Sequence, residues 1–131
     1  MTEPVFYVDR SDIRPGMLAE ARQRMAELVD FVREREPRLI AYRFYEDADA
    51  STMTVVAVHP DSASMELHLR LGGPGFRRLG ECIRLRSVDV YGPLAPAAAE
   101  AVRAKARMLG GAAVTFHTLR AGFGRFTPPA G

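Results

Sequence analysis

The sequence predicts an α+β fold in a single domain, and three observations lead to this prediction. The chain has 131 residues, which is the size of one domain. Short runs of β-branched and aromatic residues alternate along it with stretches of helical periodicity. The order of these segments is strand, helix, strand, strand, helix, strand, and then a further helix and strand. Such a chain is expected to form a sheet with its helices packed against one face.

The predicted strands lie at residues 5–8, 39–46, 52–59, 83–91 and 114–119. Each is short, largely apolar and bounded by glycine, proline or small polar residues, which is typical of strands. Only the polar segment 47–51 separates the second strand from the third, so these two strands are predicted to form a hairpin.

The predicted helices lie before Pro37, after Asp61 and at residues 96–109. In the first, apolar residues recur every three or four positions from Leu18 to Val32, which is one stripe along a helix. In the second, Asp61 is a good N-cap, and the glycines and proline at 72–75 are expected to break the helix and leave a short helical piece at 76–82. The third is rich in alanine and is followed by two glycines.

The first six elements follow the βαββαβ order of a ferredoxin-like subunit, whose sheet is antiparallel. We therefore expect a core at about residues 5–94, extended by a C-terminal helix and strand at about residues 95–126. No internal repeat or long linker divides the chain, so residues 1–131 are expected to form one domain.

Both faces of the predicted sheet carry apolar side chains. In the third strand, Met53, Val55 and Ala57 alternate with Thr54, Val56 and Val58. The helices of one subunit cover only one face, and burial of the other at about 25 cal/mol per Å² strongly favours a cover. The simplest cover is the same face of a second copy, which predicts a homodimer in the form of a dimeric α+β barrel. The alternative is that the C-terminal helix and strand cover this face within one chain.

The composition excludes several classes of function. The net charge of +2 is too small for a general nucleic-acid binder, and no apolar run is long enough to span a membrane. A single cysteine, Cys82, excludes an internal disulfide and fits a reducing compartment. The N-terminal segment lacks the apolar core of a signal peptide, so a cytoplasmic location is expected. The 18 basic residues are arginines with a single lysine, a skew attributed to coding bias.

Four segments together resemble a known family. They are the helix start Pro15-Gly16, the hairpin YRFYEDADASTMTVVAVHPD, the segment SMELHLR and the strand end VDVYGPL. In this order they resemble the antibiotic biosynthesis monooxygenase family of the dimeric α+β barrel superfamily, over roughly residues 5–94. The resemblance implies two subunits with paired sheets, and a pocket between the sheet and the helices of each. It also implies cofactor-independent oxidation of phenols or quinols, or degradation of haem.

The chain departs from this family because it contains neither asparagine nor tryptophan. The haem-degrading members share an Asn, Trp and His constellation, and the polyketide-quinone oxygenases rely on Asn and Trp near the pocket. Neither arrangement can form here. The residue that the resemblance carries over is His68, which matches a histidine on the second helix of quinol-monooxygenase-like members.

His68 is therefore the candidate catalytic residue. An imidazole with an ordinary pKa of about 6.5 can take a phenolic proton or hydrogen-bond a quinone oxygen. The alternative is a structural histidine bonded to the backbone. His59 is expected to lie at a loop edge, and His117 at the dimer interface.

The candidate substrate-binding residues are aromatic side chains and one arginine. They are Tyr7, Tyr42, Phe44, Tyr45, Phe76 and Tyr91, together with Arg43. Rings with one polar tip suit a flat organic ligand, although plain sheet core is the alternative for each. Arg43 interrupts an apolar strand, so it is expected to be buried against a carboxylate such as Asp89 or against an anionic ligand.

No cofactor or metal site is predicted. The three histidines lack ligand spacing and Cys82 lacks a CxxC partner. The glycines at 72–75 lack the spacing of a phosphate-binding loop, and no GxSxG motif occurs. The sequence thus favours a cofactor-independent monooxygenase acting on a small aromatic, quinol or polyketide-type molecule. The alternatives are a non-catalytic ligand-binding or assembly protein and an isomerase or cyclase on the same scaffold.

Overall fold

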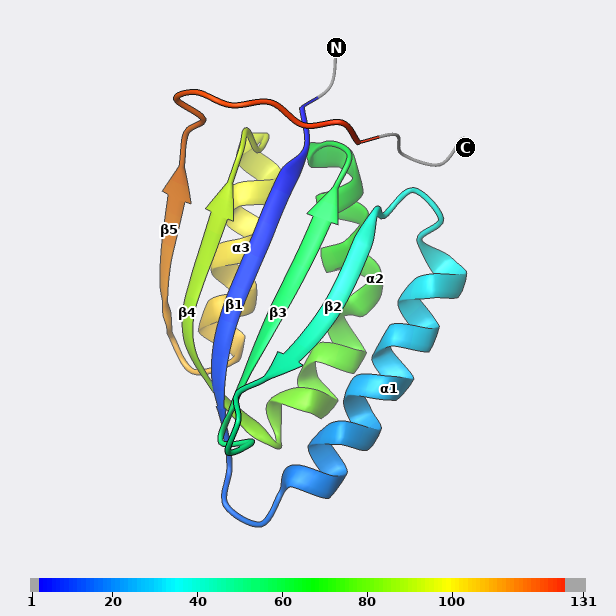
Figure 1. Ribbon diagram of the computed structural model, residues 1–131, viewed down its shortest axis with the longest axis vertical. Helices are drawn as coiled ribbons and strands as arrows, with labels where there is room; N and C mark the ends of the chain where they lie inside the picture. The colour runs from blue at the N-terminus through cyan, green and yellow to red at the C-terminus, as the bar shows by residue number, and fades with distance from the viewer. Residues whose placement is uncertain (1–2, 127–131) are drawn as a thin grey trace.

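The computed structural model describes residues 3–126 of the chain (Figure 1). Its elements run in the order β1 (Val5–Ile13), α1 (Leu18–Arg35), β2 (Ala41–Glu46), β3 (Thr52–His59), α2 (Ser62–Gly80), β4 (Ile83–Tyr91), α3 (Pro96–Met108) and β5 (Ala113–His117). This is the predicted βαββαβ order followed by a helix and a strand, so the α+β ferredoxin-like fold is confirmed. Across the described residues, no helix combines the length and the apolar character needed to cross a membrane.

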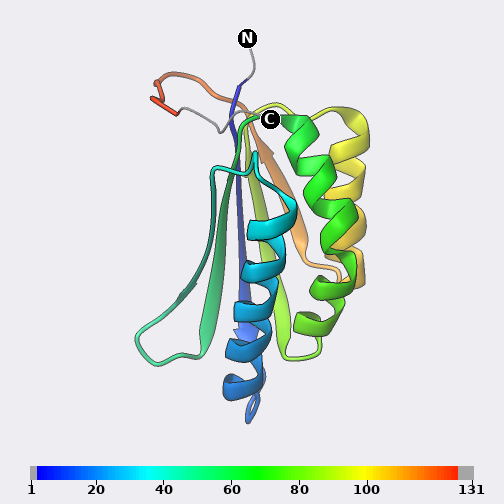
Figure 2. The same cartoon turned by 90° about the vertical axis from the view of Figure 1, so that its right-hand side faces the viewer.

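The strands form one sheet in the order β2-β3-β1-β4-β5. β1 is antiparallel to both of its neighbours, β3 and β4, whereas β5 is added parallel to β4. All three helices lie on one face of the sheet, and the opposite face is left open along most of its length (Figure 2). Thus β5 widens the sheet and α3 joins the helical layer. The alternative in which these two elements cover the second face is wrong.

α2 is one continuous helix, and the predicted break at residues 72–75 is wrong. Pro74 lies on the exposed side of the helix, so its ring meets solvent rather than the packed core. The buried face, which includes His68, Phe76 and Leu79, packs in the core and holds the helix together through this point. Tertiary packing here overrides the weak helix propensity of glycine and proline.

β1 is longer than its apolar run predicts. The run ends at Val8, yet the strand continues to Ile13. The reason is its central place in the sheet, because Asp12 pairs with Thr52 of β3 on one side and with Arg84 of β4 on the other. Backbone hydrogen bonds on both sides hold the polar half of the strand extended. The limits of β2 and β5 differ from the prediction by one or two residues.

The core lies between the sheet and the helices. The buried residues of α1 are Ala21, Met25, Leu28 and Val32, which confirms the predicted apolar stripe. Asp61 caps α2 by accepting a hydrogen bond from the amide N–H of Ser64 at 2.9 Å, as predicted. These local features hold α1 and α2 in place against the sheet.

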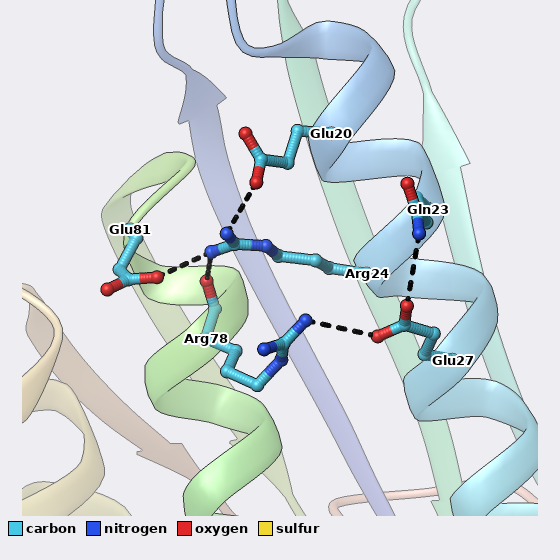
Figure 3. A network of polar contacts seen from close by, with 6 residues as sticks. All are labelled: Glu20, Gln23, Arg24, Glu27, Arg78 and Glu81. Atoms are coloured by element: carbon cyan, nitrogen blue, oxygen red, sulfur yellow. Dashed lines mark hydrogen bonds and ion pairs between the residues drawn. The ribbon is translucent and has the colours of Figure 1, made fainter.

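A polar network joins α1 to the end of α2 outside the core (Figure 3). Arg24 of α1 donates hydrogen bonds to Glu20 and Glu81, each at 2.6 Å, and it also donates to the backbone carbonyl of Arg78. The side chain of Arg78 donates in turn to Glu27 at 3.3 Å. The Arg24 side chain is only 14% exposed, but Glu20 and Glu81 are 50% and 68% exposed, so solvent screens these contacts as it does other surface ion pairs.

Candidate functional site

Polar side chains lie on the core face of β1, where apolar ones are expected. Tyr7, Asp9 and Ser11 alternate on this face, and each is 3% exposed or less. Asp9 pairs in register with Val55 of β3 and Val88 of β4, so its carboxyl group lies in an otherwise apolar row. A buried carboxylate requires a cation or hydrogen-bond donors nearby.

Lys105 of α3 supplies this cation. Its Nζ lies 3.5 Å from Oδ2 of Asp9 and donates a hydrogen bond to the hydroxyl of Tyr7 at 2.9 Å. The Tyr7 hydroxyl donates to the same Asp9 oxygen at 2.6 Å. Burial lowers the pKa of Lys105, although Asp9 acts in the opposite direction. Burial first, and then the charge of Asp9, raise the pKa of Tyr7 well above 10.0, so its hydroxyl stays protonated.

Glu36 and His68 form a second buried pair. Glu36 follows the last residue of α1, and its carboxylate oxygens lie 2.9 and 3.0 Å from Nδ1 of His68 in α2. Burial raises the pKa of Glu36 to about 7 and lowers that of His68 to about 3. At neutral pH the imidazole is therefore neutral and donates its Nδ1–H to Glu36, which leaves Nε2 as a hydrogen-bond acceptor.

His59 lies at the end of β3 with its ring centre 5.4 Å from that of His68. Its Nδ1 is 2.8 Å from the hydroxyl of Ser64, and its Nε2 is buried with no hydrogen-bond partner among residues 3–126. Burial, and then the neighbouring His68, lower its pKa to about 3. His59 is the last residue of β3, at the edge of the loop to α2 as expected, but its side chain is fully buried.

Aromatic rings surround His68. The ring centres of Tyr42 and Phe76 lie 5.0 and 5.2 Å from its own, and Phe44 lies 5.3 Å from Tyr42. Gly72 makes this packing possible, because it lies between His68 and Phe76 on one face of α2 and a Cβ there would overlap the Phe76 ring. Phe76 also contacts the buried Asp9–Lys105 pair, since Nζ of Lys105 is 4.1 Å from the centre of its ring.

Three hollows adjoin these groups. An inner cavity of about 20 Å³, with room for about one water molecule, is bordered by Asp9, Tyr42, Phe76 and Lys105 among others. A surface groove of about 500 Å³ between α2 and α3 reaches Phe76 and Lys105. A second surface hollow of about 270 Å³ lies between α1 and β2 and reaches Glu36 and Tyr42. Each surface hollow thus ends at one of the two buried pairs.

The structure brings most of the predicted site residues together, and these are His68, Tyr7, Tyr42, Phe44 and Phe76. Arg43, Tyr45 and Tyr91 lie on the opposite face of the sheet, because side chains alternate along a strand. Arg43 is exposed and donates to the hydroxyl of Tyr45 at 3.2 Å, so the expectation that it is buried is wrong. Asp89, its suggested partner, is instead 2.8 Å from Nε2 of His117.

Asp9, Glu36 and Lys105 are the members of this site that sequence reasoning missed. Asp9 and Glu36 carry no local signal, because a single acid in a strand or before a proline is usually exposed. Lys105 does carry a signal, since it is the one lysine among 18 basic residues. The skew toward arginine is interrupted at a single position, and that position lies beside the buried Asp9.

The open face of the sheet has a hollow of its own, of about 730 Å³, under the segment 118–126. Its lining includes Phe6, Tyr91 and His117, and the last two rings stack with their centres 4.4 Å apart. Among residues 3–126, no three His, Cys, Asp or Glu side chains gather closely enough to hold a metal ion.

Fold and site together define a ferredoxin-like α+β protein with acid–base groups buried between its sheet and its helices. No family model matches the chain, and no curated protein matches its sequence. Among solved structures, MupZ from Pseudomonas fluorescens is similar with a TM-score of 0.75 and 15% identity, over 95% of this chain and 96% of that one. SnoaB, a cofactor-independent oxygenase from Streptomyces nogalater, is similar with a TM-score of 0.60 and 18% identity, over 72% of this chain and 96% of its own.

A third similar structure is a Caulobacter crescentus protein provisionally assigned as an antibiotic biosynthesis monooxygenase. Its TM-score is 0.62 at 12% identity, over 72% of this chain and 92% of that one. These likenesses confirm the ferredoxin-like α+β fold of the single chain. The overlap with SnoaB is about the size of the β1–β4 core, whereas the overlap with MupZ is long enough to include α3 and β5.

Proposed function

We propose that this protein is a cofactor-independent oxygenase that oxidises a small aromatic, quinol or polyketide-type molecule with O₂. The observation that carries the proposal is the buried Glu36–His68 pair beside the rings of Tyr42 and Phe76. The fold shared with SnoaB, itself a cofactor-independent oxygenase, supports it.

The Glu36–His68 pair takes the first proton, from a phenolic hydroxyl or an activated CH₂ group of the substrate. A carboxyl group with a pKa of about 7 exchanges protons readily at neutral pH. The substrate anion transfers one electron to O₂, and the two radicals combine through a new C–O bond. At a CH₂ group, loss of water from the resulting peroxide leaves a carbonyl. One oxygen atom stays in the product and the other departs as water with the two hydrogens, so no external reductant is consumed.

The substrate is expected to reach the pair through the hollow between α1 and β2, which Glu36 and Tyr42 line. Tyr42 and Phe76 then offer apolar ring surfaces to a flat molecule. The inner cavity has only about 20 Å³, so these rings must separate when a ring-sized ligand binds. Binding is therefore expected to expand the layer between the sheet and the helices.

An oxygen electrode tests the proposal with a panel of anthrones, hydroquinones and naphthols. We expect O₂ uptake with at least one compound, and for an anthrone a product that gains one oxygen atom and loses two hydrogens. Incorporation of ¹⁸O from labelled O₂ identifies the source of that atom. Conversion at constant mass would contradict the oxygenase and favour isomerisation or ring closure. Absence of both turnover and thermal stabilisation across the panel would favour a non-catalytic assembly protein.

The isomerase or cyclase remains the second candidate because of Lys105. The hydrogen-bonded series Lys105–Tyr7–Asp9 adds a proton donor beside the inner cavity. It requires α3, because Lys105 belongs to that helix. The structural overlap with SnoaB is about the size of the core without this helix, whereas the overlap with MupZ includes it. A base at Glu36–His68 and an acid at Lys105 suit proton transfer between two positions of one substrate.

We also expect two copies of the chain to pair through the open face of the sheet. Val8 lies on this face, opposite Val56 of β3 and Asp89 of β4. Replacing Val8 with aspartate should give a folded monomer, because a charge buried in an apolar interface costs free energy. Sedimentation velocity measures the change, and Ala26→Asp on the exposed surface of α1 is the matched control. A wild-type protein that sediments as a monomer would contradict the dimer.

A further inference from the structure

Lys105 is the only primary amine that a side chain of this protein offers. The chain uses arginine at its other basic positions, and the exception lies in the core between α3 and β1. An arginine could pair with Asp9 as well as a lysine can, since its guanidinium is the better partner for a carboxylate. What a lysine offers and an arginine does not is an amine that can lose its proton and act as a nucleophile.

The surroundings of Lys105 suit that chemistry. The side chain is only 9% exposed, and its Nζ lies 4.1 and 4.6 Å from the ring centres of Phe76 and Tyr7. An apolar enclosure of this kind favours the neutral amine, and burial lowers the pKa of Lys105. Two proton carriers lie beside it, the Tyr7 hydroxyl at 2.9 Å and the Asp9 carboxylate at 3.5 Å.

Lys105 can be reached from the surface, and a polar atom without a partner lies near it. Lys105 and Phe76 border both the 500 Å³ groove between α2 and α3 and the inner cavity, so they separate the two spaces. Alanines of α3, among them Ala101 and Ala104, keep the groove open beside Lys105. In the core, Oδ1 of Asp9 is buried without a hydrogen-bond partner among residues 3–126, and Asp9 borders the inner cavity.

We propose that Lys105 is a nucleophilic amine that forms an imine with a small ketone or aldehyde reaching it through the groove between α2 and α3. This goes beyond the oxygenase and does not depend on it, because the step requires neither O₂ nor the Glu36–His68 pair.

The step balances with groups that are present. Asp9 takes one proton from the ammonium, and the free Nζ attacks the carbonyl carbon, so that a C–N bond forms and the carbonyl π bond breaks. The second proton of Nζ moves to the carbonyl oxygen, which gives the carbinolamine. The Tyr7 hydroxyl then hands a proton to that oxygen and takes in its place the proton held by Asp9, with which it is hydrogen-bonded. The oxygen leaves as water, and the nitrogen returns its last proton to Asp9 to give a neutral imine. The net change is amine plus carbonyl to imine plus water, with no oxidation or reduction.

Acetylacetone is the probe that tests this proposal, because a 1,3-diketone condenses with an amine to an enaminone that absorbs in the near ultraviolet. The folded full-length protein is treated at neutral pH, and the adduct is located by peptide mass mapping. We expect one adduct, heavier by the diketone less one water, on Lys105. The only competing amine is the N-terminal one, which peptide mapping distinguishes.

A matched control moves the single lysine to a solvated position on the same helix. In the double variant Lys105→Arg/Arg107→Lys, the amine lies at a site whose native side chain is 63% exposed. Lys105 should react faster than the lysine at position 107, because burial lowers its pKa and so leaves more free amine at neutral pH. An adduct on Lys105 that forms no faster than the one at position 107 would overturn the proposal. So would labelling of the wild-type protein at its N-terminus but not at Lys105.

The acid–base partners provide a second measurement that leaves Lys105 in place. Tyr7→Phe keeps the ring that packs on Nζ and removes only the hydroxyl. The rate of adduct formation should fall while Lys105 remains the labelled residue. An unchanged rate in a variant with native circular dichroism would overturn the role given to Tyr7 and with it the relay.

Discussion

Replacing His68 with alanine should lower oxygen-dependent turnover by about 10²–10⁴-fold, the usual contribution of a positioned acid–base group. Its Nδ1 is hydrogen-bonded to both oxygens of Glu36, so the substitution removes the partner that orients this carboxylate. The oxygen electrode measures the effect on the best substrate of the panel, and circular dichroism verifies that the variant is folded.

Two further variants make this result specific. Glu36→Gln keeps an oxygen that can accept from Nδ1 but removes the carboxylate, so a comparable loss of turnover is expected. His59→Gln removes the other buried imidazole, whose ring centre lies 5.4 Å from that of His68, and should retain most of the turnover. Equal losses in the His59 and His68 variants would indicate a general packing effect. Full turnover in the His68 variant would exclude the pair as the proton acceptor.

The protein should lose stability steeply as the pH falls below 6.5. The pKa values of His59 and His68 in the folded state are about 3, below the ordinary value of 6.5, because burial disfavours the imidazolium. The stability that they contribute is therefore fully present above pH 6.5 and is lost as the pH falls toward 3. Glu36 acts in the opposite sense, since its pKa of about 7 exceeds 4.5 and its protonation between these values favours the folded state.

The two histidines bind more protons in the unfolded state, whereas the single glutamate binds more in the folded state. Between pH 6.5 and 4.5 the unfolded state therefore binds on average about one proton more than the folded state. This corresponds to about 1.4 kcal/mol per pH unit, or about 3 kcal/mol across the window. Urea denaturation at about pH 7.5, 6.5, 5.5 and 4.5 measures how the free energy of unfolding changes with pH. Surface carboxylates whose pKa is lowered, such as those of Glu46 and Glu100, add to this loss only near pH 4.5 and below. Asp47, whose pKa is lowered first by its hydrogen bond from Thr52, affects stability only below 3.8.

The double variant His59→Gln/His68→Gln separates the two contributions. Without its imidazoles the protein should no longer lose stability between pH 6.5 and 4.5, and Glu36 should make it slightly more stable as the pH falls. A wild-type free energy of unfolding that stays constant across this window would contradict the buried neutral state of the histidines. An unchanged slope in the double variant would assign the acid sensitivity to other groups.

The acid–base site shows where sequence reasoning succeeds and where it ends. His68 could be predicted because its helix is recognisable in the sequence and a family resemblance points to it. Its partner Glu36 was not, because a glutamate before a proline at a helix end is usually solvated. Tyr45 and Tyr91, by contrast, are predicted site residues that lie outside the site. Both are strand aromatics, but a one-residue shift along a strand places a side chain on the opposite face.

The order of the elements, the apolar stripe of α1 and the cap at Asp61 follow from the amino-acid order alone. They depend on periodicity and turn chemistry, which act over a few residues. The pairing of Glu36 with His68 joins positions 32 residues apart, and that of Tyr7 with Lys105 joins positions 98 apart. Only the packing of three helices on one face of the sheet brings these groups together. Burial then changes their pKa values, because desolvation depends on the whole surrounding structure rather than on the neighbours in sequence.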